Sequence, residues 1–352
     1  MASLPPQTLE ASTATVEPAQ PPATRPTLSV VIAAHNVEGY LGGTIESVLG
    51  QTVRDLALIV VLDRCTDGSV ALARGYADSD PRVEIVEAAA GGVSTARNLG
   101  LDRVRGPYVL FLDGDDLMAA DAVEAFLGGF RAQPAAVAVV GGHSKIDETD
   151  RLIDGESAAD RPGFGASDAL GQLLARNTIV NGGTLAMRTD AAREAGGFDP
   201  RISIAEDWEF WCRLALLGSF ASLGQRPVLF YRQRRKSAFS QHGLASADLD
   251  AKAIDKVFAL PAIQARVPAR QLARLRRNAA IDYFWATARA ALYGGNRWRF
   301  LQLVLIGLWR FPDSLLKGFL VRFIWRKSLG LSLIHISEPT RQLMSSRMPS
   351  SA

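Results

Sequence analysis

The chain has 352 residues, of which 48% are hydrophobic and 21% are charged, and its formal net charge is +3. These values describe a globular protein with a substantial core and exclude a fibrous or wholly disordered chain. Only two cysteines occur, so no disulfide framework is available, and the four histidines show no zinc-binding spacing.

The first 26 residues are rich in Pro, Thr, Ala and Gln and lack any periodicity, which predicts a disordered leader. No basic-then-apolar signal peptide opens the chain. The longest charge-free apolar run near the C-terminus, residues 300–309, is too short to span a bilayer. We therefore expect a protein that is made and kept in the cytoplasm.

From residue 28 onward, buried-type strands alternate with helical patterns. This alternation predicts βαβ units and a mostly parallel sheet covered by helices on both faces. In such sheets, ligands bind outside the carboxyl ends of the strands. The expected strands are 28–33, 57–62, 83–86 and 108–112, with helices at about 40–49 and 69–76 and another after 91–98. The polar residues that follow these strands, and should meet at one rim, are His35, Asp63, Arg97, Asp113 and Asp115.

The strand at 108–112 runs directly into Asp113-Gly114-Asp115-Asp116. Unpaired ionised carboxylates are very costly away from water, so this run should emerge in a crevice where a positive charge meets it. Hard oxygen ligands at this density suit Mg²⁺ or Mn²⁺ bound together with a substrate's phosphates. The alternative is an ordinary acidic turn in which Asp116 caps a helix at 117–130.

Four segments, 29–36 (SVVIAAHN), 60–69 (VVLDRCTDGS), 91–98 (GGVSTARN) and 111–116 (FLDGDD), carry a family resemblance. Their order and spacing resemble the family 2 glycosyltransferases, over roughly residues 27–240. The resemblance implies the GT-A fold, a Rossmann-like and mostly parallel α/β sheet. It also implies an inverting transferase that uses a nucleotide-sugar donor, with a UDP-sugar expected.

The resemblance also implies roles for residues along the rim. The turn from Ala33 to His35 would cradle the nucleotide base and Asp63 would contact it. Asp115 would hold the metal on the diphosphate, with Asp113 beside it. The family often has an aromatic residue where this chain has His35, a departure that bears on which base is bound. Simple turn chemistry is the alternative for Asp63, and we assign Asp67 to capping the helix at 69.

Arg97 and the preceding glycines form the third rim segment. Gly91 and Gly92 permit positive φ angles and a close approach of the backbone to a ligand. Arg97 could reach a phosphate or the base, or it could be solvated on the first turn of its helix.

Further along, strands are expected at 136–141 and 228–231, with a polar loop at 145–162 and helices over 247–292. Glu206-Asp207 resembles the acidic pair that opens a helix under the acceptor sugar in the family. A carboxylate at a helix N-terminus is held ionised by the helix dipole, so Asp207 is the predicted general base. The alternative is that both residues merely cap the helix. Arg234 stands where the family often has a histidine, and it could neutralise the leaving diphosphate or lie in a solvated basic loop.

Residues 297–327 interleave aromatic and aliphatic side chains with seven cations and one acid. This pattern suits helices at the interface of an anionic membrane; a helical pair packed on the catalytic domain is the alternative. Residues 331–352 resemble the translation of a sequencing adapter, and we interpret them as an artefact.

The domains expected are therefore a leader (1–26), a GT-A domain (27–240), a helical and possibly membrane-associated extension (241–330) and the adapter-like tail (331–352). The expected activity is metal-dependent transfer of a sugar to a hydroxyl of a glycan or lipid-linked acceptor in bacterial surface polysaccharide synthesis. The chain should act at the inner face of the plasma membrane, without a nucleic-acid partner. Two rivals remain, a silent nucleotide-sugar-binding subunit and a sugar nucleotidyltransferase. Intact Asp115 and Asp207 argue against the first, and a turn at 33–36 without a phosphate-gripping loop argues against the second.

Overall fold

The computed structural model describes residues 26–312 except 90, 154–167, 235–248 and 294. The leader at 1–25, the adapter-like tail and the basic-aromatic segment beyond 312 lie outside the described residues. In the described part, one eight-stranded sheet has the order β3-β2-β1-β4-β7-β6-β8-β5. Its strands are β1 (Leu28–Ala34), β2 (Leu56–Asp63), β3 (Val83–Ala88), β4 (Tyr108–Asp113), β5 (Leu117–Met118), β6 (Ala138–Ile146), β7 (Leu185–Arg188) and β8 (Phe220–Arg232).

The sheet has a parallel half and a mixed half. Strands β3, β2, β1 and β4 are all parallel, as the βαβ pattern predicts. β7 then pairs antiparallel with both β4 and β6, while the long β8 runs parallel to β6 and antiparallel to β5. The strands β7, β6, β8 and β5 thus extend the sheet past β4, whose carboxyl end lies near the middle of the sheet.

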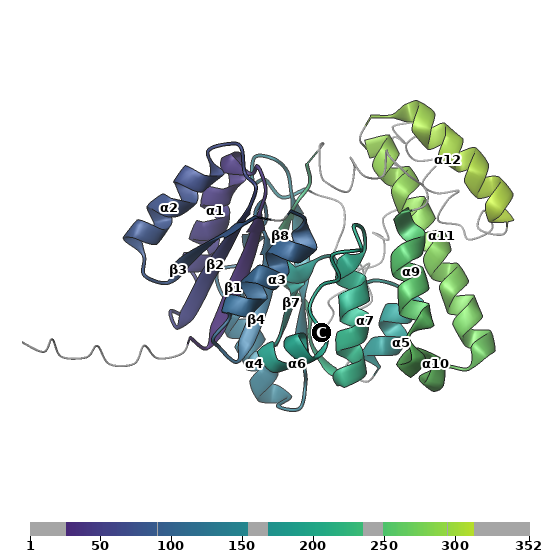
Figure 1. Cartoon of the computed structure of the whole chain (residues 1–352), viewed down its shortest axis with the longest axis horizontal. Helices are drawn as coiled ribbons and strands as arrows, with labels where there is room; N and C mark the ends of the chain where they lie inside the picture. The colour runs from purple at the N-terminus through teal and green to yellow at the C-terminus, as the bar shows by residue number, and fades with distance from the viewer. Residues whose placement is uncertain (1–25, 90, 154–167, 235–248, 294, 313–352) are drawn as a thin grey trace, which may run out of the picture.

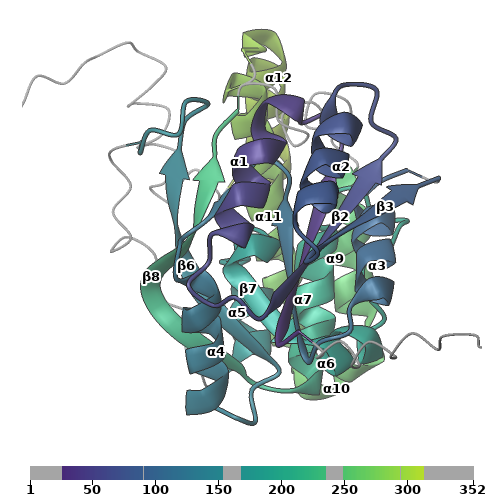
Figure 2. The same cartoon turned by 90° about the vertical axis from the view of Figure 1, so that its left-hand side faces the viewer.

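Helices cover both faces, as Figures 1 and 2 show. One face carries α1, α2 and α4, and the other carries α3, α5, α6 and α7. Beyond them, α9 and α11 pack beside α7, and α12 packs on α11. The helices are α1 (Glu38–Leu49), α2 (Ser69–Ser79), α3 (Val93–Arg103), α4 (Ala122–Ala132), α5 (Ala169–Ala175), α6 (Thr189–Glu194), α7 (Glu206–Leu217), α9 (Leu249–Ala259), α10 (Pro261–Arg266), α11 (Ala269–Tyr293) and α12 (Arg297–Arg310).

The continuous apolar runs of the parallel strands supply both cores. In β1, Val31 faces the cluster under α3 and α7, whereas Val30 and Ile32 face the cluster under α1 and α4. Alternate residues of a strand point to opposite faces, so a strand buried on both sides must be apolar throughout. The fit is close where α3 crosses β1, because a Cβ on Gly100 would lie 2.2 Å from a methyl of Val31.

The predicted start of one helix, α2, is confirmed, and that of another, α4, is wrong. Asp67 accepts hydrogen bonds from the backbone N–H groups of Ser69 and Glu38, so it secures the starts of α2 and α1 in a structural role, as expected. The expected helix at 117–130 is wrong in its first turn. Residues 117–118 form β5 against β8, and α4 begins only at Ala122.

The C-terminal helices are anchored on the α/β part of the molecule. Trp208 of α7 packs against Phe258 of α9 and Tyr283 of α11. α12 in turn crosses α11 tightly, since a Cβ on Gly307 would lie 2.7 Å from the rings of Phe284 and Trp285. Among the described residues, no helix has both the length and the apolarity needed to cross a bilayer.

Phe111 of β4 gives a direct test of this core. Its side chain is 1% exposed, whereas that of Trp309 on α12 is 86% exposed. Phe111→Ala should lower the free energy of unfolding by about 3–5 kcal/mol, because it leaves a cavity under the sheet. Trp309→Ala should change it by less than about 0.5 kcal/mol. Urea unfolding of both variants checks this, and equal losses would contradict the packing described.

Candidate active site

The carboxyl ends of the parallel strands lie side by side at one rim of the sheet. The β1–β4 register pairs Ala33 with Asp113, and the β1–β2 register pairs Ala34 with Leu62, directly before Asp63. The first turn and the two aspartates therefore meet at one edge, where open α/β sheets bind their ligands.

Asp63 and His35 are held by the backbone around them. Nδ1 of His35 donates to the Asp63 carbonyl oxygen over 2.5 Å, because a carbonyl can only accept. The Asp63 carboxylate accepts a 2.8 Å bond from the Gly92 N–H, and Gly92 has a φ of 114°. That angle lies in the region that glycine adopts readily, so the expected positive φ is present. The second strand end and the loop before α3 are thus joined.

Arg97 lies at the centre of the rim. Its guanidinium bonds to Asp113 over 2.8 Å and to Glu206 over 2.9 Å, and it stacks over Phe198 at 5.1 Å. The side chain is only 7% exposed, so it is not a solvated arginine. Burial opposes the charged form, but Asp113 and Glu206 outweigh it and raise the pKa of Arg97. Arg97 thereby ties the end of β4 to the start of α7.

Asp116, expected as a possible helix cap, is instead a buried structural carboxyl. It is 1% exposed, and it accepts bonds from Asn181 over 2.6 Å and from the Arg232 backbone N–H over 2.8 Å. Burial and the neighbouring charges of Asp113 and Asp115 raise its pKa well above the usual range. Asp116 therefore joins β4 to β8, and its surroundings favour the protonated form.

Asp115 faces a second arginine cluster. Arg234 lies 2.6 Å from its carboxylate, and the Nε of Arg232 donates to its carbonyl oxygen over 2.6 Å. Both guanidinium groups stack over the ring of Tyr40, at 4.9 Å for Arg232 and 5.4 Å for Arg234. Burial and Asp113 raise the pKa of Asp115, and Arg234 opposes the shift. Arg234 is thus paired at the rim and does not lie in a solvated loop.

Asp207 lies in the first turn of α7, where the sequence places it, but its electrostatics differ from the expectation. Its carboxylate accepts a 2.5 Å bond from the Trp208 N–H. Burial and then the Glu206 charge raise the pKa of Asp207 to about 7, while Arg97 opposes the shift. Desolvation therefore outweighs the helix dipole, which by itself would lower the pKa of this carboxyl. A pKa near neutrality is nevertheless well matched to a general base.

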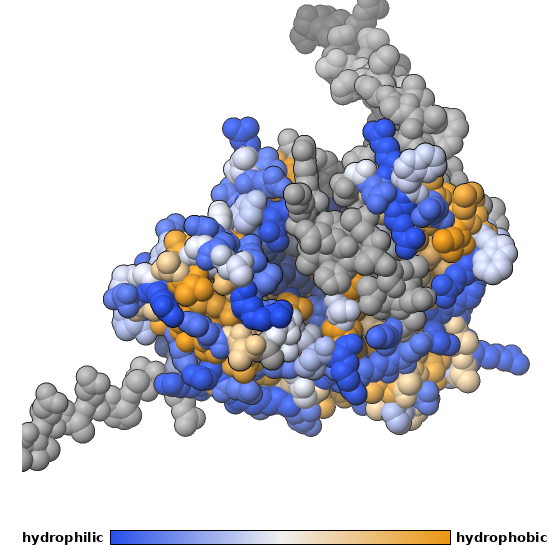
Figure 3. Space-filling model, turned by 45° about the horizontal axis from the view of Figure 1, so that its top comes forward, coloured by the Kyte–Doolittle hydropathy of each residue, from blue (hydrophilic) through white to orange (hydrophobic). Residues whose placement is uncertain are grey.

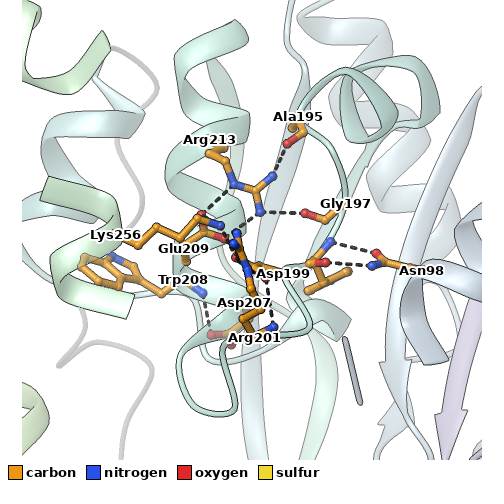
Figure 4. A network of polar contacts seen from close by, with 11 residues as sticks. Asn98, Ala195, Gly197, Asp199, Arg201, Asp207, Trp208, Glu209, Arg213 and Lys256 are labelled. Carbon is orange, nitrogen blue, oxygen red and sulfur yellow. Dashed lines mark hydrogen bonds and ion pairs between the residues drawn. The ribbon is translucent and has the colours of Figure 1, made fainter. Parts of the chain in front are cut away.

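A polar network fixes the helix that carries Asp207 (Figure 4). Glu209 is fully buried and pairs with Arg213 over 2.6 Å and with Lys256 of α9 over 3.0 Å. Lys256 also reaches Asp199 over 2.6 Å, and Arg213 donates to the Gly197 carbonyl. The buried charges are therefore paired, and breaking such a pair would be strongly destabilising. The network therefore anchors α9 to α7, the helix that carries the predicted general base Asp207.

The rim residues fit a divalent cation in one particular way. Within the described ranges, no group of three His, Cys, Asp or Glu residues is arranged to hold a metal ion by itself. Asp113 and Asp115 nevertheless lie at the rim with side chains 32% and 16% exposed. Mg²⁺ commonly binds through one or two carboxylates plus substrate phosphates and waters. These two residues fit that mode, in which phosphates and waters would complete the ligand set.

Several site residues were not anticipated from the sequence. Asn181 bonds to both Asp113 and Asp116, Tyr40 supports the arginine pair, and Arg232 binds the backbone of the acidic run. Asn181 precedes two glycines, a pattern typical of a turn, but nothing in that pattern indicates a contact with the acidic run. The sequence gives no signal for Tyr40, because its partners Arg232 and Arg234 are almost 200 residues away in the chain.

Solved structures with this fold were found by comparison of the whole chain. Staphylococcus aureus TarS 1–349 in complex with UDP-GlcNAc aligns over 79% of this chain and 89% of its own, with 15% identity and a TM-score of 0.52. The Pyrobaculum calidifontis mannosyltransferase PcManGT, in complex with GDP-Man and Mn²⁺, covers 87% and 83%, with 17% identity and a TM-score of 0.53. At these identities the likeness establishes the fold, which is GT-A.

Curated relatives match parts of the chain. The uncharacterized glycosyltransferase EpsJ of Bacillus subtilis is 39% identical over 95 residues, or 27% of this chain. The chondroitin synthase of Escherichia coli is 27% identical over 200 residues, or 57% of this chain. The match spans 28% of the length of each of these relatives. Residues 29–196 match the model of glycosyl transferase family 2. This range includes the carboxyl ends of β1, β2, β3 and β4 and the whole of β7. The chain therefore contains a glycosyl transferase family 2 domain over residues 29–196.

Proposed function

We propose that this chain is a metal-dependent, inverting glycosyltransferase that moves a sugar from a nucleotide-diphosphate donor, a UDP-sugar, to an acceptor hydroxyl. The observation that carries the proposal is the Arg97 bridge. It joins Asp113, at the predicted diphosphate site, to Glu206, which adjoins the predicted base Asp207. A single displacement needs a leaving-group site and a base on opposite sides of one sugar, and this bridge supports the proposal that both lie at one rim.

On the donor side, the turn at Ala33–His35 and Asp63 would receive the base, and Arg97 would lie near the phosphates. The bound UDP-GlcNAc and GDP-Man of the two structural neighbours support a nucleotide-sugar donor. Asp115, assisted by Asp113, would hold Mg²⁺ or Mn²⁺, which supplies charge stabilisation for the departing diphosphate. Arg234 would add a second positive charge beside that leaving group.

On the acceptor side, Asp207 would take the proton of the attacking hydroxyl. The acceptor oxygen then bonds to the anomeric carbon while the bond from that carbon to the diphosphate breaks, which inverts the configuration. Trp208 and the Lys256 network would hold α7 in place during this step. The acceptor in this proposal is a glycan or a lipid-linked molecule, and the reaction belongs to bacterial surface polysaccharide synthesis. The relative named as a chondroitin synthase supports a glycan.

We further propose that α12 holds the chain at the inner face of an anionic plasma membrane. One side of α12 packs on α11 through Phe300 and Leu303. The opposite side exposes apolar side chains at helical spacing, and it lies at the end of the molecule seen at the right of Figure 3. Lipid headgroups match its composition, because basic residues border the apolar stripe. The exposed residues are Trp298 (79%), Leu301 (50%), Leu305 (67%), Ile306 (39%) and Trp309 (86%), beside Arg297, Arg299 and Arg310.

Removal of the metal tests the donor site. EDTA should abolish the release of UDP from a UDP-sugar and acceptor, and Mn²⁺ or Mg²⁺ should restore it. Asp115→Asn should lower turnover by roughly 10²–10³-fold, the scale of losing one electrostatic stabiliser. The exposed Asp121→Asn serves as the matched control and should behave as wild type. Undiminished turnover in EDTA would refute the metal requirement.

Asp207→Asn tests the base. It should lower turnover by roughly 10²–10⁴-fold while leaving the dissociation constant of UDP unchanged. Because the pKa of Asp207 is raised to about 7, the wild-type rate should climb with pH and level off above that value as the carboxylate ionises. Kinetics across pH and calorimetric titration with UDP measure both effects. An equal loss of UDP affinity would place Asp207 on the donor side instead.

The α12 proposal is tested by sedimentation with vesicles. The full chain should bind vesicles containing phosphatidylserine, and binding should weaken with salt, since each basic residue near the surface contributes about 1 kcal/mol. The double variant Trp298→Ala/Trp309→Ala should bind about tenfold more weakly. Leu152→Ala removes an exposed apolar residue elsewhere and is the control. Identical binding by all three proteins would show that α12 is not the anchor.

A further inference from the structure

Both carboxylates that the proposed function assigns to a divalent cation are already paired with arginines. Asp113 pairs with Arg97 over 2.8 Å, and Asp115 pairs with Arg234 over 2.6 Å. A guanidinium at 2.6 Å satisfies much of the charge and hydrogen-bonding capacity of a carboxylate oxygen. A metal ion approaching Asp115 would also be repelled by that guanidinium. The metal and Arg234 are therefore competitors for one side chain.

The two arginines differ in how firmly they are held. Arg97 is 7% exposed, projects from α3 and bonds to two carboxylates at once. Arg234 is 22% exposed, lies two residues past the end of β8 and makes its ion pair with Asp115. The Nε atoms of both arginines are buried and have no hydrogen-bond partner among the described residues, so each ion pair leaves its arginine incompletely satisfied. Arg234 differs from Arg97 in its greater exposure and in having one carboxylate partner, where Arg97 has two, in the described part of the chain.

Arg232 is held in place by hydrogen bonds, and its guanidinium shares the ring of Tyr40 with that of Arg234. Arg232 is tied to backbone carbonyls of Asp115 and Asp147, and its side chain is 3% exposed. The Tyr40 ring contacts Arg232 and Arg234 together. A cation–π contact holds a guanidinium to a ring face without fixing which acceptor its N–H groups meet. Arg234 can thus leave Asp115 while keeping its contact with Tyr40.

We propose that Arg234 is an exchangeable internal counter-ion: it neutralises Asp115 in the ligand-free enzyme, and it moves to the donor diphosphate when a divalent cation takes Asp115. This inference rests on the proposed donor site and adds a binding order to it. The metal alone binds weakly because it must displace Arg234 without giving it a new partner. Metal and nucleotide together bind strongly, because the diphosphate accepts the displaced guanidinium, and this coupling is reciprocal.

The test is Mn²⁺ binding followed by electron paramagnetic resonance, with and without UDP. Arg234→Gln should bind Mn²⁺ alone at least about tenfold more tightly than wild type, since the competing cation is gone. UDP should raise the Mn²⁺ affinity of wild type strongly but that of Arg234→Gln much less. Arg234→Lys keeps the positive charge and should bind Mn²⁺ alone nearly as weakly as wild type.

Arg226→Gln is the matched control. It removes one positive charge from β8, the strand that precedes Arg234, where Arg226 pairs with the exposed Asp121, and it should bind Mn²⁺ as wild type does. Unchanged or weaker binding of Mn²⁺ alone to Arg234→Gln, with the fold intact by circular dichroism, would overturn the exchange. If wild type bound Mn²⁺ but no UDP-sugar or UDP, the donor proposal would fail, and the metal-only comparison would still decide whether Arg234 competes.

Discussion

Three carboxylates within four residues at the end of β4 are the constraint on which the rest of the site depends. Each one is accommodated in a different way. Asp116 is buried against Asn181 in surroundings that favour its neutral form, so it acts as a structural link to β8. Asp113 and Asp115 stay at the rim, where Asp113 is paired with Arg97 and Asp115 with Arg234. Both carboxylates are therefore paired before any ligand arrives, and a cation that binds them must rearrange these ion pairs.

One of these arginines, Arg97, connects the two halves of the proposed reaction. It bonds to Asp113 at the end of β4 and to Glu206, the residue before the predicted base Asp207. Behind Asp207, the Glu209–Lys256 pair and Trp208 anchor α7 to the C-terminal helices. Those helices consequently have two roles in this account. One end supports the predicted base, and the exposed side of α12 at the other end faces the proposed membrane.

Local patterns predicted the parallel half of the sheet and its rim, because buried strands need continuous apolar runs and their polar ends must emerge together. They failed where distant segments decide the structure. Asp116 resembled a helix cap, but its partner is the Arg232 N–H, 116 residues away. Asp207 was expected to be ionised by the helix dipole, yet burial, followed by the Glu206 charge, raises its pKa to about 7. Tyr40 was missed because only folding places it under the arginine pair.

The most direct measurement of the central claim is the anomalous X-ray signal of Mn²⁺ in crystals of the full chain grown with UDP. The account predicts one strong peak, from an Mn²⁺ ion that lies roughly 2.0–2.2 Å from an Asp115 oxygen and next to the diphosphate of UDP. It also predicts that the Arg234 guanidinium has left Asp115 for a phosphate oxygen. UDP bound at the rim with the Arg234–Asp115 pair intact, or Mn²⁺ bound away from Asp115, would contradict the account.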